Sequence, residues 1–141
     1  MVILGIDTAI RRTGYGVVRM EGNRIHVLDC GVIKNAPSLK HSECLRRIYM
    51  GIKELVDAFK PDAASIEMAF VGKNVRTTMI LSMARGAAIA SASNAGVPVY
   101  EYSPKTAKRS AKTRSRLLTK ILFIPILRKK SDMTTPGRAT K

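Results

Sequence analysis

The chain of 141 residues has no tryptophan and only two cysteines, Cys30 and Cys44. Two cysteines cannot build a disulfide framework, so we expect reduced thiols and a cytoplasmic protein. Long apolar runs are also missing. The longest, Ile121 to Leu127, has seven residues and contains Pro125, whereas a membrane span needs about 20. The N-terminal MVILGID has no basic segment and an early acid, which is unlike a signal peptide.

Acidic residues are scarce. The chain has 10 Asp and Glu against 25 Lys and Arg, a formal net charge of +15. The excess is uneven, because residues 1–103 hold 13 basic and 9 acidic side chains, and residues 104–141 hold 12 and 1. A field of this sign favours nucleic acid or another acidic partner. Most of the excess lies near the C-terminus, so the total overstates the basicity of the preceding residues.

The length and the apolar fraction of 45% are typical of one globular domain. Three apolar runs separated by short polar turns predict an antiparallel meander of strands. A helix, a strand, a helix and a strand should follow, and Ser103-Pro104 should open a third helix. This order predicts an α/β fold with a mixed sheet, in which helical crossovers extend the meander. The expected strands are residues 2–7, 14–20, 25–33, 63–67 and 97–102, and an apolar stripe over residues 45–59 predicts the first helix. An apolar stripe over residues 79–88 marks the second helix, for which we expect Asn74 as the N-cap and Gly96 as the C′ glycine.

Two carboxylates stand at the ends of apolar strands. Asp7 closes VILGID and Glu67 closes AASIE. If the two strands are neighbours, the carboxylates meet, and their repulsion is relieved when a cation lies between them. Mg²⁺ takes a few carboxylates together with water and phosphate oxygens, and pairs of such ions serve phosphodiester hydrolysis. The alternative is that each acid is only a capping or surface group.

Three segments resemble the RuvC family of crossover (Holliday) junction endodeoxyribonucleases: ILGIDTAIRRTGYGVV, PDAASIEMAFVGKNVRTTMILSMARGAAIASA and GVPVYEYSPKTAKRSA. The resemblance covers residues 2–111. It implies an RNase H-like mixed five-stranded sheet with flanking helices and a homodimer. It also implies two-Mg²⁺ hydrolysis of four-way DNA junctions in recombination and repair, together with the RuvA-RuvB branch-migration complex.

The resemblance also implies roles for single residues. Asp7 and Glu67 match catalytic metal ligands of the family. The helix around Met79 to Ala92 looks like the helix through which the family dimerises. The resemblance also implies DNA contacts. Phe70 matches an aromatic that wedges against bases, and Lys108 matches a basic residue close to the scissile phosphate. Lys73, Asn74 and Arg76 match residues that line the DNA groove.

The chain departs from the family after Ala111. The family carries two further Asp in a last helix, within a D-A-x-D-A-L-A pattern, whereas residues 112–141 are basic and contain Asp132 as their one acid. We therefore expect an incomplete RNase H-like nuclease domain over residues 1–111, lacking the last catalytic helix. Residues 112–141 would be a divergent, loosely ordered tail, arising from a frameshift or from genuine divergence. The second Mg²⁺ site is then in doubt.

Three functions remain open from the sequence. An active junction endonuclease requires a third carboxylate, for which Glu101 and Asp132 are the candidates. A catalytically impaired relative would bind junctions without cutting them. An ATP-binding protein of the actin-like class would share the first strand and turn, although Thr8-Ala9 lacks the glycine that its phosphate loop requires.

Overall fold

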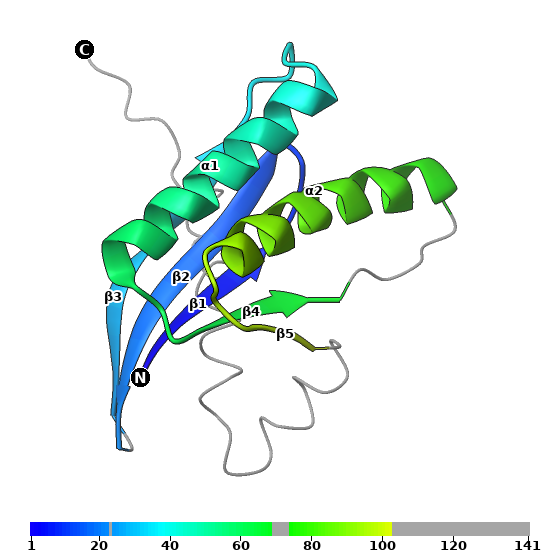
Figure 1. Cartoon of the computed structure of the whole chain (residues 1–141). Coiled ribbons are helices and arrows are strands. Elements are labelled where there is room, and N and C mark those ends of the chain that lie inside the picture. Colours follow the sequence, from blue (N-terminus) through cyan, green and yellow to red (C-terminus); the bar gives the residue numbers. More distant parts are fainter. Residues whose placement is uncertain (23, 69–73, 103–141) are drawn as a thin grey trace, which may run out of the picture.

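A computed structural model describes residues 1–22, 24–68 and 74–102. Five strands and two helices follow one another in these residues (Figure 1). The predicted third helix and the predicted tail at residues 112–141 lie outside the described residues. The elements are β1 (Val2–Asp7), β2 (Arg12–Glu21), β3 (Arg24–Lys34), α1 (His41–Phe59), β4 (Ala63–Glu67), α2 (Val75–Asn94) and β5 (Val99–Tyr102).

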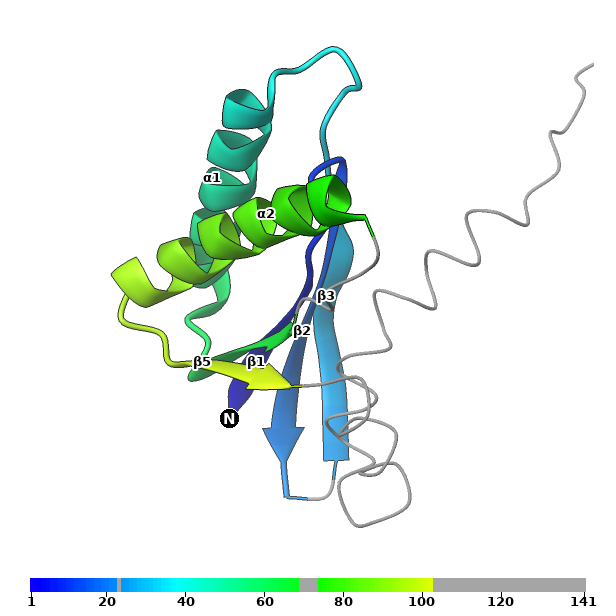
Figure 2. The same ribbon diagram turned by 90° about the vertical axis from the view of Figure 1, so that its right-hand side faces the viewer.

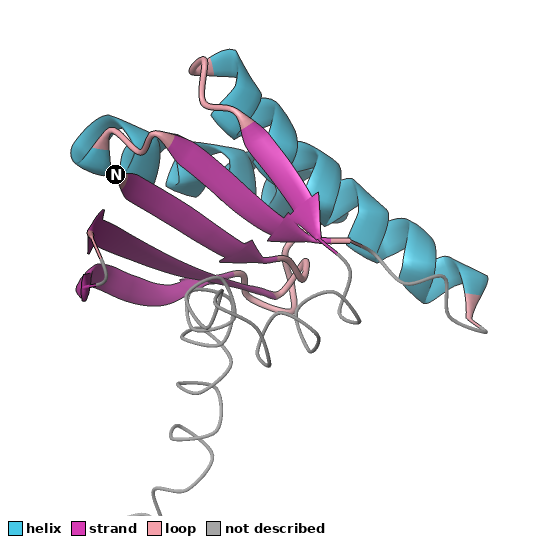
Figure 3. Cartoon of the chain, turned by 90° about the horizontal axis from the view of Figure 1, so that it is seen from below, coloured by secondary structure: helices cyan, strands magenta, loops and turns pink. Residues whose placement is uncertain are grey.

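The strands form one mixed sheet in the order β3-β2-β1-β4-β5. β1 pairs antiparallel with β2, β2 pairs antiparallel with β3, and β1, β4 and β5 are parallel. The meander and the two helical crossovers predicted from the sequence are confirmed, and β1 and β4 are direct neighbours. Both helices lie on the same side of the sheet (Figures 2 and 3). Neither of the two described helices combines the length and apolar character that a membrane crossing requires.

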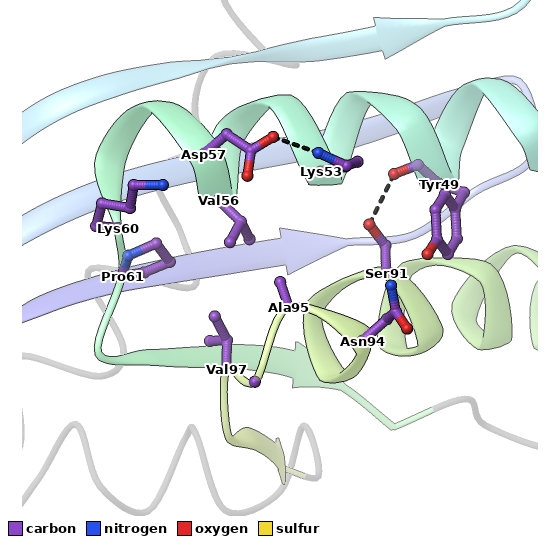
Figure 4. Close-up of a pocket in the computed structure, with 11 residues that line it drawn as sticks. Tyr49, Lys53, Val56, Asp57, Lys60, Pro61, Ser91, Asn94, Ala95 and Val97 are labelled. Carbon is purple, nitrogen blue, oxygen red and sulfur yellow. Dashed lines mark hydrogen bonds and ion pairs between the residues drawn. The ribbon is translucent and has the colours of Figure 1, made fainter.

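The core fills the space between the sheet and the two helices. One cluster joins inward side chains of β1, β2 and β4 to the apolar stripe of α1 and the alanines of α2: Leu4, Ile6, Val17, Ile66, Ile48, Ile52, Ala84, Ala88 and Ala92. The small alanine side chains let α2 approach α1 closely. Where the helices meet, the buried Ser91 Oγ donates to the carbonyl oxygen of Tyr49 at 2.7 Å (Figure 4).

A groove of about 420 Å³ opens beside this crossing (Figure 4). It lies between the C-terminal halves of α1 and α2, and Pro61 and Val97, which precede β4 and β5, form its floor. Lys53 and Asp57 on its rim form an ion pair. The groove is therefore at the starting ends of the parallel strands, whereas Asp7 and Glu67 close the other ends.

The ends of the elements follow local chemistry. α1 begins at His41, four residues before the apolar stripe begins at Leu45, because a helix continues beyond its buried face. It ends at Phe59, and its C-cap Lys60 adopts a left-handed conformation (φ 47°) directly before Pro61. The predicted cap of α2 is confirmed, since Asn74 Oδ1 accepts from the Thr77 backbone N–H at 3.1 Å. Gly96, after the C-terminal cap, has the expected positive φ of 76°.

Replacing Ile48 by alanine tests the core. Ile48 is fully buried between α1 and the sheet, so the Ile48→Ala variant should lose about 2–5 kcal/mol of unfolding free energy through lost burial and the cavity left behind. Urea denaturation followed by circular dichroism measures the change. Glu54→Ala, at an exposed position of the same helix, is the matched control and should stay within about 0.5 kcal/mol of the parent. Equal losses in both variants would contradict the packing described here.

Candidate metal centre at the ends of β1 and β4

The parallel pairing of β1 and β4 brings Asp7 and Glu67 together. Ile6 is the partner of Ile66 in the ladder, so the next residue of each strand is one of the two acids. Because the strands run in the same direction, their carboxyl ends meet at one edge of the sheet. The expected adjacency of the two strands, which brings the two carboxylates together, is confirmed.

Both carboxylates project from the face of the sheet that is turned away from the helices. Ile6 and Ile66 point into the core under α1 and α2, and successive side chains of a strand point to opposite faces. Asp7 and Glu67 are each half-buried. The site is therefore built on rigid strands, while the hydrophobic core lies behind it.

The electrostatics of the site favour a cation. Burial, together with the negative charge of Asp7, raises the pKa of the Glu67 carboxyl above its ordinary value. A divalent cation between the two carboxylates relieves the repulsion, and carboxylate oxygens suit a hard ion such as Mg²⁺. Within the described ranges, no third Asp, Glu, His or Cys side chain completes a metal-binding group with them.

Tyr102 adds a hydroxyl to this face. It is the partner of Glu67 in the β4–β5 ladder and is half-buried. Burial first, and then the charges of Glu67 and Asp7, raise the pKa of its phenol well above the ordinary value, so the hydroxyl stays a hydrogen-bond donor at neutral pH. The sequence patterns did not point to Tyr102 as a site residue. The available signal was that residues 67 and 102 each close a strand of a parallel pair.

Glu101 does not join the carboxylate pair. It is the ladder partner of the core residue Ile66, so it belongs to the helix-covered side of the sheet. Its carboxylate forms an ion pair with Arg85 of α2. The suggestion that Glu101 supplies the third carboxylate is therefore wrong, because the parity of β5 turns it away from Asp7 and Glu67. The other candidate, Asp132, lies outside the described residues.

Glycines flank Asp7 on the neighbouring strand. Gly14 is the direct partner of Asp7, and Gly16 is the partner of Gly5. No side chain projects from these three positions, so the carboxylate has only backbone on its β2 side. Glycine inside a strand commonly marks a place where a ligand or another backbone approaches closely.

The loop that follows Asp7 is held by hydrogen bonds. Arg11 Nη1 donates to the carbonyl oxygens of Ala36 and Leu39 at 2.6 and 3.0 Å. The buried Asn35 Nδ2 donates to the carbonyl oxygen of Ile10 at 2.8 Å. These bonds tie the β1–β2 loop to the β3–α1 connection, so the backbone beyond Asp7 has a fixed course.

The other predicted site residues separate into two groups. Asn74 and Arg76 are at the N-terminus of α2, both exposed, and Asn74 also caps the helix. The first turn of α2 contains no acidic residue. Phe70, Lys73 and Lys108 lie outside the described residues.

Comparison with known proteins agrees with this geometry. Residues 3–116 match the family model described as crossover junction endodeoxyribonuclease RuvC. A protein of that name from Ruminiclostridium cellulolyticum is 36% identical, over 94% of this chain and 85% of the relative. One from Chlorobaculum parvum is 42% identical, over 77% of this chain and 58% of the relative, so the match spans little more than half of that protein. The structure of Thermus thermophilus RuvC in complex with Holliday junction substrate is 27% identical, with a TM-score of 0.75, over 99% of this chain and 84% of that one.

Replacing Glu67 by glutamine tests the electrostatics of the pair. The raised pKa means that ionised Glu67 opposes folding, so stability falls as pH rises above the ordinary glutamate value of 4.5. Without divalent cations, Glu67→Gln should therefore melt above the parent at pH 7, and the difference should disappear below pH 4.5. Mg²⁺ should raise the melting temperature of the parent more than that of the variant. Thermal melts from pH 4 to 8, with Glu54→Gln as control, measure both effects. A variant that melts below the parent at pH 7 contradicts the assignment.

Proposed function

The chain belongs to the RuvC family of crossover junction endodeoxyribonucleases, which are hydrolases of the nuclease class, and on this basis we propose that it cleaves four-way DNA junctions by metal-dependent phosphodiester hydrolysis. The observation that carries the proposal is the adjacency of Asp7 and Glu67 on one face of the sheet. The likeness to a RuvC structure in complex with Holliday junction substrate supports the choice of substrate.

Asp7 and Glu67 are the proposed ligands of a divalent cation, which we take to be Mg²⁺. When bound, such an ion supplies positive charge to the phosphate and lowers the pKa of a coordinated water. Asp7 and Glu67 would hold the ion and help to position a water nucleophile as hydrogen-bond acceptors, and Tyr102 would offer a donor beside them. Two carboxylates neutralise one Mg²⁺. The second ion expected for the family would need further ligands from residues outside the described part of the chain.

The N-terminus of α2 is the proposed start of the DNA-binding surface. A helix N-terminus carries partial positive charge and unpaired N–H groups, which favour phosphate. In α2 this effect is strengthened by Arg76 and by the lack of acids in the first turn. Asn74 lies at the same end. Phe70 and Lys73, which directly precede this helix in the sequence, and Lys108 complete the proposed set of DNA contacts.

The outer face of α2 is the proposed homodimer surface. Val75, Met79 and Met83 are 68%, 62% and 45% exposed and follow one another at intervals of four residues. Gly86 continues this stripe, and a Cβ placed there would meet no other atom within 4 Å. Large exposed apolar side chains beside a small residue suit close packing against a second helix. The buried alanines of α2 lie on its other side, so dimerisation would leave the core unchanged.

Two further expectations rest on the family alone. We propose that the chain works with the RuvA-RuvB branch-migration complex. We also propose that it acts in the cytoplasm, where chromosomal DNA lies in bacteria such as those that supply its relatives.

Cleavage of a labelled four-way junction is the direct test of the proposed activity. The parent chain with Mg²⁺ should produce symmetric nicks, and Glu67→Gln should lose at least about 100-fold in rate because it removes a metal ligand. Denaturing gels of the junction and of a linear duplex with the same sequence measure rate and selectivity. Glu54→Gln is the matched control. Junction binding without nicks in the parent would favour the catalytically impaired relative instead. A parent that neither binds nor nicks the junction would refute the proposal.

Charge on the α2 stripe tests the dimer. Met79→Lys should convert a dimeric parent to a monomer, because burial of an unpaired charge opposes association. Sedimentation velocity at several concentrations measures the change. Met50→Lys, at an exposed methionine of α1, should remain dimeric. A parent that sediments as a monomer throughout would contradict the proposed surface.

A further inference from the structure

Arg85 connects α2 to the two strands that end beside the carboxylates. Its side chain is 18% exposed, so most of it is buried between the helix and the sheet. Nε donates to the backbone carbonyl oxygen of Glu67 at 3.3 Å. Nη2 forms the ion pair with Glu101 of β5. One guanidinium therefore holds the last residue of β4 and the neighbouring strand at the same time.

Arg85 contacts the main chain of Glu67 from the helix-covered face of the sheet. The Glu67 carboxylate projects from the far face of the sheet, whereas Arg85 approaches from the helix side and binds the main chain. The β4–β5 ladder pairs only four residues of each strand, from Ala64 to Glu67 and from Val99 to Tyr102. A fixed carbonyl at its last pair limits rotation of the Glu67 peptide and hence the direction of its side chain.

We propose that Arg85 is the positioning residue for the metal-binding carboxylate of Glu67, and that Glu101 orients Arg85. This inference deepens the proposed function and rests on it, because it assumes that Asp7 and Glu67 bind a divalent cation. The planar guanidinium presents several donors in a fixed fork, so it can serve a carbonyl and a carboxylate together. A lysine ammonium, which is a point charge on a flexible stem, cannot fix both in one geometry.

The direction in which the affinity for a divalent cation changes in Arg85→Gln separates a positioning role from a purely electrostatic one. Arg85 is a positive charge near a cation site, so its charge alone repels the ion. If Arg85 acted only through its charge, Arg85→Gln would bind a divalent cation more tightly than the parent. If Arg85 positions Glu67, the same variant binds the cation more weakly.

Binding of Mn²⁺ to the full chain without DNA tests the inference independently of cleavage. Titration calorimetry should show about 10-fold or greater loss of affinity in Arg85→Gln, the usual size for loss of a group that orients a ligand. Arg46→Gln, which removes an arginine ion-paired with Glu43 on the exposed side of α1, is the control and should bind as the parent does. Glu101→Gln should weaken binding in the same direction. The Arg85→Gln/Glu101→Gln double variant should lose no more than Arg85→Gln alone, because both changes break one contact.

The results distinguish failure of the metal site at Asp7 and Glu67 from failure of the positioning role of Arg85. If Glu67→Gln binds Mn²⁺ as tightly as the parent, the metal site itself is wrong and the inference fails with it. If Glu67→Gln loses binding but Arg85→Gln equals or exceeds the parent, only the positioning role of Arg85 is overturned. Thermal melts establish that each variant is folded. If Arg85→Gln does not fold, Arg85→Lys replaces it. Weaker binding in that variant supports the inference, and parental affinity overturns it.

Discussion

The parallel pairing of β1 with β4 is the constraint on which the rest of the structure depends. It joins two strands that begin 61 residues apart, at Val2 and Ala63, and it aligns two runs of apolar residues that each end in a carboxylate. β2, β3 and α1 lie between these two strands in the chain, and α1 covers the pair with a hydrophobic stripe. The cost of placing two like charges side by side is met by the core behind them, where Ile6 and Ile66 lie under both helices. The apolar contacts behind the site thus support the strands that carry its two carboxylates.

The sequence was most informative where burial changes abruptly. The bounds of β1 and β4 were predicted correctly, because apolar runs that stop at Asp7 and Glu67 have clear ends. The cap at Asn74 and the glycine at position 96 were also predictable, since each has a local chemical reason. Partnership between β1 and β4 could only be proposed, because strand pairing is a long-range property that no local pattern encodes.

The sequence could not show which side chains of β5 face the helices and which face away from them. Glu101 and Tyr102 are adjacent in the chain, and either could have faced Glu67. The register of β5 decides between them: it places Tyr102 beside Glu67 and turns Glu101 toward Arg85. For the same reason nothing in the sequence indicated a role for Arg85, since an arginine within a helix is usually a solvated charge. The role of Arg85 depends on its two partners, the Glu67 carbonyl oxygen and the Glu101 carboxylate, which only the folded sheet brings close to it.

Alternation along β1 and β4 divides each strand into two sets of side chains with different surroundings. One set is packed under the helices and determines whether the chain folds. The other set faces away from them and includes Ile3, in a second buried cluster, together with the proposed metal ligands Asp7 and Glu67. A descendant could exchange Asp7 or Glu67 without disturbing Ile6 or Ile66, and could therefore outlive its original chemistry as a stable scaffold. Architecture in such a lineage is a longer-lasting record of ancestry than the reaction it once supported.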